Sequence, residues 1–321
     1  MHCDSLTALS YPQLRSGEGQ LDLTRLQTPG ALQCFAIFLP KRLGNLYQRT
    51  LTFADLFDRM VAENPDLVMA VRTPEDYRIA VEKGRLAAML TIEEGATIEG
   101  DIAKLRHLYS RGVRMMTLTW NYPNEIGYPN LDINEYSQNR LESLYRTDPR
   151  PLTEFGRQVV AEMNALGMMV DVSHLSDGGF WDVLSLSTKP IVASHSNARA
   201  VCPVARNLTD PMLVALAEHG GITGLNLCPD FLRAAPTDDL LQSAVRHVLH
   251  IHQVAGEDVL AIGTDFDGIH ALPPLEGCQR MPLLHTALLE HLPSRVVDKM
   301  WTDNFLRVWQ ENQPTAPQER A

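Results

Sequence analysis

The sequence contains no long hydrophobic run, no cluster of basic residues and few cysteines. No apolar stretch in its 321 residues approaches the roughly 20 that a membrane-spanning helix needs, so we expect no membrane partner. The net charge of −11 and the scattered lysines and arginines argue against nucleic acid as a partner. Five widely spaced cysteines do not make a disulfide framework and fit a reducing compartment. The first residues, MHCDSLTALSY, lack the basic and apolar regions of a signal peptide, so a cytoplasmic location is expected.

Apolar segments of strand length alternate with amphipathic segments of helix length along the chain. Runs of Val, Ile and Met are typical of parallel strands buried on both faces, and their alternation with helices predicts βα units. A short strand is expected at the N-terminus, and seven more at 34–39, 86–92, 113–118, 168–172, 191–194, 222–227 and 259–263. Eight units predict an α/β fold, a closed (β/α)8 TIM-like barrel with its active site at the C-terminal ends of the strands.

One barrel domain is expected over residues 1–312. The polar segment 120–151 shows no periodicity, which predicts a long loop that is either a lid over the site or a plain insertion. Residues 313–321 are polar and rich in proline, so a disordered C-terminal tail is expected.

Helix start and stop signals support the expected alternation. Asp210 is the expected N-cap of one helix, with Pro211 at its first position and Gly220 as its stop. Another helix is expected to open at Thr153 and close at Gly167.

Imidazoles and carboxylates recur where the predicted strands end. They are His2 and Asp4 at the first strand, Glu93 and Glu94 at the third, His174 and His195 at the fifth and sixth, and Asp265 and Asp267 at the eighth. Each alone is more often a structural residue, but repetition on five strands indicates a site. These side chains suit divalent zinc, and a carboxylate between two ions can bridge them in a hydrolytic centre.

The motifs around these residues resemble a known family. They are HCD at the start, IEEG at 92–95, DVSHLSD at 171–177, PIVASHSNARAVCPVARNLTD at 190–210, AIGTDFDG at 261–268 and DNFLRVW at 303–309. Together they resemble the membrane (renal) dipeptidase family of zinc-dependent dipeptidases, which are barrels of the amidohydrolase type. The resemblance runs nearly from end to end.

The resemblance implies a dinuclear zinc dipeptidase with two Zn²⁺ per chain. The substrate implied is a dipeptide with a free C-terminal carboxylate, including dipeptides with a C-terminal D-residue. One ion falls to His2 and Asp4, the other to His174 and His195, and Glu93 bridges them. Asp265 is implied as the group that moves the proton and also contacts the substrate. Arg206 is implied to bind the substrate carboxylate, with Trp120 and Asn121 beside it.

Two positions differ from better-known members of that family. Glu94 stands where many have glycine, and Trp120 stands where the mammalian enzymes have a histidine that helps hold the substrate carbonyl. An indole donates one hydrogen bond but neither ligates a metal nor accepts a proton. These differences bear on the choice of substrate.

Only Met1 precedes His2, so the first strand is expected to be short with a partly unpaired edge, unless the protein begins upstream. A short, flexible strand predicts that the ion at His2 and Asp4 binds more weakly than the other ion.

Other interpretations remain open. The chain could be a related amidohydrolase acting on another small amide, ester or lactam, or a metal-deficient barrel that serves as a scaffold. His247, His250 and His252 share one helix, but they are expected on the outside of the barrel. The sequence lacks GxGxxG, P-loop and GxSxG motifs, so nucleotide-binding and serine-hydrolase functions are not expected. The sequence is also compatible with a homodimer.

Overall fold

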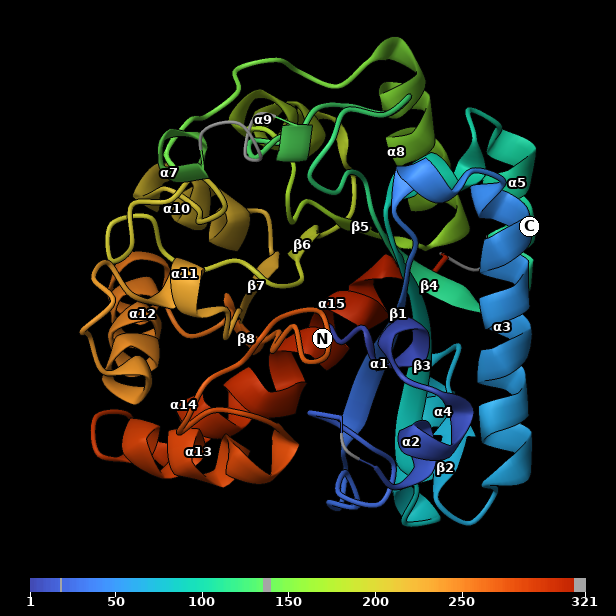
Figure 1. Cartoon of the computed structure of the whole chain (residues 1–321), viewed down its shortest axis with the longest axis horizontal. Helices are drawn as coiled ribbons and strands as arrows, with labels where there is room; N and C mark the ends of the chain where they lie inside the picture. Colours follow the sequence, from blue (N-terminus) through green and yellow to red (C-terminus); the bar gives the residue numbers. More distant parts are fainter. Residues whose placement is uncertain (18, 135–139, 315–321) are drawn as a thin grey trace, which may run out of the picture.

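The computed structural model describes residues 1–17, 19–134 and 140–314. The fold is the predicted (β/α)8 barrel, with parallel strands ringed by helices (Figure 1). Its strands follow the order β1-β3-β4-β5-β6-β7-β8, and β2 adds to β3. The bounds are β1 Leu32–Phe38, β2 Val68–Ala70, β3 Leu86–Glu93, β4 Val113–Thr117, β5 Met169–Asp171, β6 Val192–Ala193, β7 Ile222–Leu225 and β8 Leu260–Ile262.

The N-terminal segment closes the barrel between β8 and β1 (Figure 1). Cys3 forms a parallel bridge with Phe266, and its carbonyl accepts from the amide of Ala36 on β1, 2.9 Å away. The amide of Asp4 donates to the carbonyl of Phe266 at 2.9 Å, and the Met1 nitrogen donates to the carbonyl of Ile262 at 2.5 Å. This short strand is therefore paired on both sides, so the expectation of a partly unpaired edge was wrong.

Strand register brings the C-terminal ends of the strands to one rim. Phe38 pairs with Glu93, Glu93 with Thr117, and Thr117 with Asp171, so these four residues form one row across β1, β3, β4 and β5. The loops that follow these strands therefore open on the same face, as the barrel geometry requires.

Helices surround the strands, and one of them, α15 Asn304–Asn312, lies at an end of the barrel. The other longer ones are α3 Leu46–Glu63, α4 Pro74–Glu82, α5 Ile102–Ser110, α8 Glu154–Leu166, α9 Asp177–Leu186, α10 Asp210–Glu218, α12 Leu240–Ala255 and α13 Met281–Leu289. The shorter ones are α1 Ser5–Ala8, α2 Tyr11–Arg15, α7 Arg140–Ser143, α11 Pro229–Leu232 and α14 Ser294–Asp298. Single turns are η1 Lys41–Leu43, η2 Gly95–Ile98, η3 Cys278–Arg280 and the π-helical η4 Lys299–Asp303.

Capping residues explain where two of these helices begin. Thr153 caps α8 by accepting from the amide of Gly156, and Gly167 ends that helix in the left-handed region, as predicted. On α10 the cap is Thr209, which accepts from the amide of Met212, so the expectation that Asp210 is the N-cap was wrong. Thr209 has the extended backbone of a cap, and Asp210 is already helical.

Two apolar layers hold the barrel together. Inward-facing strand residues such as Met89, Met115 and Met169 pack against Phe305, Val308 and Trp309 of α15, away from the rim where the site residues lie. Outward-facing strand residues pack against the surrounding helices. Helix α15 thus fills one end of the barrel, and the other end is left for the site.

The long segment 120–151 is anchored at several points. Pro129 bridges Leu175, and the segment carries α7, whereas residues 135–139 lie outside the described residues. Most of the expected C-terminal tail, residues 315–321, also lies outside the described residues. Within the described part of the chain, no helix has the length and apolar character needed to cross a membrane.

Candidate metal centre

Six side chains, from four strand ends and the N-terminal strand, converge at the open rim. All of them are buried: His2 and Asp4 from the first strand, Glu93 from the end of β3, His174 after β5, His195 after β6 and Asp265 after β8. The sequence predicted each of them as a site residue, and the structure places them together.

The Glu93 carboxylate has His2 near one of its oxygens and the pair His174 and His195 near the other. Its Oε2 is 3.1 Å from His2 Nε2, while its Oε1 is 2.9 Å from His174 Nε2 and 3.6 Å from His195 Nε2. One carboxylate oxygen therefore faces each group. This is the arrangement that a bridging carboxylate needs.

His2 also faces two further carboxylates. Its Nε2 is 3.8 Å from Asp4 Oδ1 and 4.0 Å from Asp265 Oδ1. Two sets of three residues, His2 with Glu93 and His195, and His2 with Asp4 and Asp265, have ligand atoms within 4.8 Å of one another. Gly268 allows this close approach, because a Cβ there would lie 1.9 Å from Asp4 Oδ2.

The donor atoms fit divalent cations. Asp4 Oδ1 is buried with no hydrogen-bond partner among the described residues. His174 and His195 turn their Nε2 atoms toward each other at 2.9 Å, while their Nδ1 atoms are engaged elsewhere. Two imidazole lone pairs at that distance repel each other unless a cation or a proton lies between them. The nitrogen and carboxylate donors match the ligand preference of zinc.

Neighbouring side chains fix the orientation of both imidazoles. His174 Nδ1 donates to Asn121 Oδ1 at 2.7 Å, and His195 Nδ1 lies 2.7 Å from Ser194 Oγ, which itself donates to Asp171 Oδ2. Such partners set the tautomer of a ligating histidine. Asn121 was predicted to contact substrate. Its hydrogen bond with His174 shows that it also orients this imidazole. The roles of Ser194 and Asp171 were missed, although both lie within the motifs noted in the sequence.

Burial and charge divide the histidines into two kinds. Burial opposes the charged form of His2, but the carboxylates of Glu93, Asp4 and Asp265 outweigh burial and raise its pKa to about 10. Burial and the Arg206 guanidinium lower the pKa of His174 to about 4, and burial together with His2 lowers the pKa of His195. Burial, with Glu93 adding to it, raises the pKa of Asp265 to about 6.

Backbone strain gathers at this rim. Of the six non-glycine residues with positive φ in the described ranges, four lie at the ends of the site strands: Glu94, His174, Asp265 and Asp267, with φ of 98°, 70°, 63° and 66°. Conformations of this kind cost about 1–3 kcal/mol each and persist where the surroundings hold them. These four conformations therefore lower the stability of the fold, and they set the direction in which the side chains point.

Arg206 lies beside the cluster and is 4% exposed. Its two terminal nitrogens donate to Ser196 Oγ at 3.3 Å and to the carbonyl of His195 at 3.2 Å, and its Nε has no partner among the described residues. A buried guanidinium with donor capacity to spare is suited to a carboxylate.

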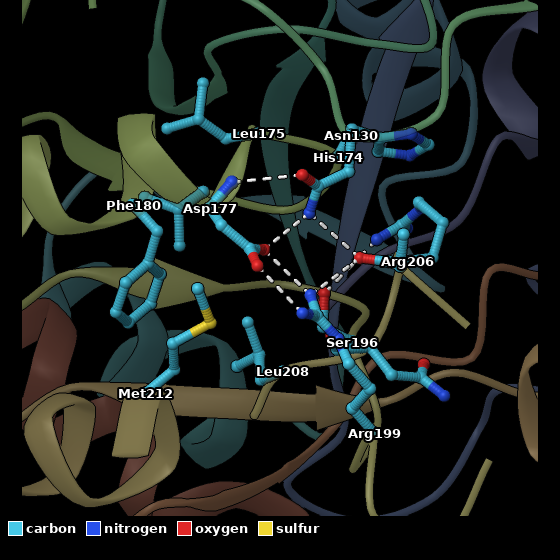
Figure 2. A pocket seen from close by; sticks show the side chains of 13 residues that line it. Asn130, His174, Leu175, Asp177, Phe180, Ser196, Arg199, Arg206, Leu208 and Met212 are labelled. Atoms are coloured by element: carbon cyan, nitrogen blue, oxygen red, sulfur yellow. Dashed lines mark hydrogen bonds and ion pairs between the residues drawn. The ribbon is translucent and has the colours of Figure 1, made fainter. Parts of the chain in front are cut away.

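A network of polar side chains lies behind Arg206 (Figure 2). Asp177 accepts two bonds of 2.8 Å from Arg199, and Asn130 donates to Asp177 at 2.7 Å and to the carbonyl of Ala205 at 2.9 Å (Figure 2). Arg199 also donates to the Ala205 carbonyl, at 3.0 Å. The carbonyl of Ala205, the residue before Arg206, is therefore held by both Asn130 and Arg199. Asp177 and Arg199 lie within the noted motifs, but the sequence gave no reason to pair them.

Trp120 borders the open cleft of about 560 Å³ above the cluster. Its ring lies 4.7 Å from that of Phe38 and 5.5 Å from that of Tyr122. Glu94 holds the backbone of this loop, because its carboxylate accepts from the amide of Trp120 at 3.0 Å and from Asn124 Nδ2 at 2.7 Å. Burial raises the pKa of Glu94 to about 7.

Two histidines of α12, His247 and His250, serve the fold. His247 Nδ1 accepts from the amide of Ala198 at 3.1 Å and its Nε2 donates to the carbonyl of Leu232 at 2.9 Å, while His250 Nε2 lies 2.7 Å from Asp210. The two imidazoles therefore have different partners. His247 instead ties α12 to the loop that follows His195.

Comparisons with known proteins agree with this geometry. The sequence profile of the membrane dipeptidase family, peptidase family M19, matches residues 2–321. A Klebsiella pneumoniae protein described as an uncharacterized protein in the pqqA 5′ region is 33% identical over 264 residues, which are 80% of this chain and 94% of that protein.

Two solved structures have the same architecture. One is the dipeptidase AC, a metallopeptidase of family M19, with 29% identity, a TM-score of 0.83 and coverage of 94% of this chain and 91% of that chain. The other is a metallopeptidase from Rhodobacter sphaeroides bound to a phosphinate mimic of the dipeptide L-Ala-D-Ala. It has 26% identity, a TM-score of 0.85 and coverage of 97% of both chains.

Proposed function

Because this chain belongs to the membrane dipeptidase family (peptidase family M19), whose members are metal-dependent peptide-bond hydrolases, we propose that it is a dinuclear zinc dipeptidase. Its substrates are dipeptides with a free C-terminal carboxylate. C-terminal D-residues are included, and the related Rhodobacter sphaeroides structure with its mimic of L-Ala-D-Ala supports that choice.

The observation that carries the proposal is the position of Glu93. One of its oxygens faces His2 and the other faces His174 and His195, at 2.9–3.6 Å. A single ion would need histidines near only one of the two carboxylate oxygens of Glu93. We therefore assign one Zn²⁺ to His2, Asp4 and Glu93, and a second to Glu93, His174 and His195.

When bound, the ions supply Lewis acidity toward the amide carbonyl and toward water. Asp265 takes the proton of the attacking water and passes it to the leaving amine. Asn226 Nδ2 donates to its Oδ2 at 3.0 Å, which leaves Oδ1 facing the cluster. A carboxylate in this position can accept a proton and pass it on.

Arg206 binds the substrate carboxylate. Its guanidinium is buried beside the cluster and has a nitrogen to spare, so a bidentate contact would place the preceding amide bond over Glu93. Arg206 therefore selects the amide bond next to a free C-terminal carboxylate, and in a dipeptide this is the only amide bond.

The test combines metal content with substrate choice. The purified protein should contain two zinc ions per chain and hydrolyse L-Ala-L-Ala and L-Ala-D-Ala, but not their C-terminal amides. Glu93→Gln should lose zinc and activity together. Glu99→Gln is the matched control, because Glu99 is an exposed carboxylate just beyond η2 that pairs with Lys104.

Equal hydrolysis of the acids and the amides would contradict the role of Arg206 and favour an amidohydrolase with another substrate. Full activity with a single ion per chain would contradict the dinuclear assignment.

A further inference from the structure

One wall of the cleft above the cluster is built from apolar side chains. Trp120 is joined there by residues from the end of β1, from η1 and from α3. They are Phe38, Leu39, Leu43 and Phe53. Trp120 and Phe38 are half-buried and pack together, so part of each ring remains open to the cleft. Glu94 fixes the backbone of Trp120 and thereby its place in this wall.

The apolar wall lies across the barrel from Arg206. Around the barrel the strands run Met1–Asp4, β1, β3, β4, β5, β6, β7 and β8, so β1 and β6 are four places apart in either direction. Phe38 ends β1, whereas Arg206 follows β6. The cluster of Glu93 and its histidines lies between them.

This topology orients a bound dipeptide. If the C-terminal carboxylate is held by Arg206 and the amide lies over the cluster, as the proposed function requires, the N-terminal residue extends toward β1. We propose that the wall of Phe38, Leu39, Leu43, Phe53 and Trp120 is the binding pocket for the N-terminal side chain. The enzyme then prefers dipeptides that begin with a large apolar or aromatic residue.

The chemistry of the wall sets the selectivity. Its apolar surface stabilises each methylene that leaves water, so replacing an N-terminal Ala with Leu should raise kcat/KM roughly tenfold to a hundredfold. Arg49 also borders the cleft, held by a bond from its Nε to the carbonyl of Gly44 at 3.2 Å. Its charge repels an N-terminal lysine side chain, which should therefore be cleaved more slowly than leucine.

Two dipeptide series test the proposal. In one the C-terminal residue is D-Ala and the N-terminal residue is Gly, Ala, Leu, Phe or Lys, and in the other the N-terminal residue is Ala and the C-terminal residue varies. The kcat/KM values should rise along the first series to Leu and Phe and fall at Lys. A flat first series would overturn this inference alone, whereas no hydrolysis of any dipeptide would overturn the proposed function and this inference with it.

Variants of α3 locate the effect. Phe53→Ala should reduce the preference for Leu over Ala by about fivefold or more. Leu51→Ala is the matched control, because it removes apolar bulk from the same helix outside the cleft. Phe53→Leu, a milder change, should give a smaller reduction in the same direction. Unchanged selectivity in folded Phe53→Ala and Phe53→Leu would overturn the assignment of the wall.

Discussion

Acidification should remove the two metal ions one after the other, because their histidines differ in charge. In the metal-free protein the three carboxylates around His2 outweigh burial and hold its pKa at about 10, so His2 is protonated at neutral pH. His174, with a pKa of about 4, and His195, with a lowered pKa, are neutral there. A cation that binds at His2 must displace a proton, whereas one at His174 and His195 does not.

The size of the effect follows from the gap between pH and pKa. At pH 7 the pKa of His2 lies about three units higher, which corresponds to about 4 kcal/mol, or a thousandfold weaker binding than to neutral His2. Below the pKa, affinity at this position should rise at least tenfold for each unit of pH. Affinity at His174 and His195 should change far less between pH 6.5 and 8.5.

The assay is a chelator titration at pH 6.5, 7.5 and 8.5, with zinc per chain and dipeptide hydrolysis followed together. This range lies above the pKa of about 6 of Asp265. We expect the His2 and Asp4 ion to leave first, with a larger gap between the two steps at lower pH. Simultaneous loss of both ions at every pH, or a first step that does not move with pH, would refute the reasoning.

The sequence predicted the same order of loss for another reason, a flexible first strand. The structure removes that reason, because Cys3 and Asp4 are buried and hydrogen-bonded to β1 and to the residues after β8. The positive charge on His2 in the metal-free protein is now the reason to expect that its ion leaves first.

Three further predictions concern single side chains. Arg206→Lys keeps the charge but loses the planar fork, so KM for dipeptides should rise about tenfold to a hundredfold, with equal KM in both proteins as the contrary result. His174→Ala and His195→Ala should each abolish turnover while circular dichroism shows an intact fold, and a variant that keeps both zinc ions and activity would contradict the ligand assignment. Burial lowers the pKa of His247 to about 4, so the native state keeps it neutral while the unfolded chain takes up a proton below about pH 6.5. This histidine should therefore cost about 3 kcal/mol of stability as the pH falls from 6.5 to 4, and denaturant unfolding of His247→Gln should lack that part of the loss.

The sequence alone determined the strands that form the barrel and most of the rim. Buried parallel strands need continuous apolar runs, and the change to polar residues after each run marks where a strand ends. Glu93, His174 and His195 could be found in this way because the C-terminal ends of barrel strands meet at one face. The caps of α8 were equally local, since Thr153 and Gly167 act on their own helix.

Only the tertiary structure decided how distant segments complete each other. Closure of the barrel joins Cys3 to Phe266 and Ala36, and no local pattern encodes that pairing. The high pKa of His2 depends on Glu93, which is 91 residues away, because Coulomb energy depends on distance in space and on burial. The same holds for the apolar wall opposite Arg206, since the order of strands around a closed barrel decides which loops face each other across the site.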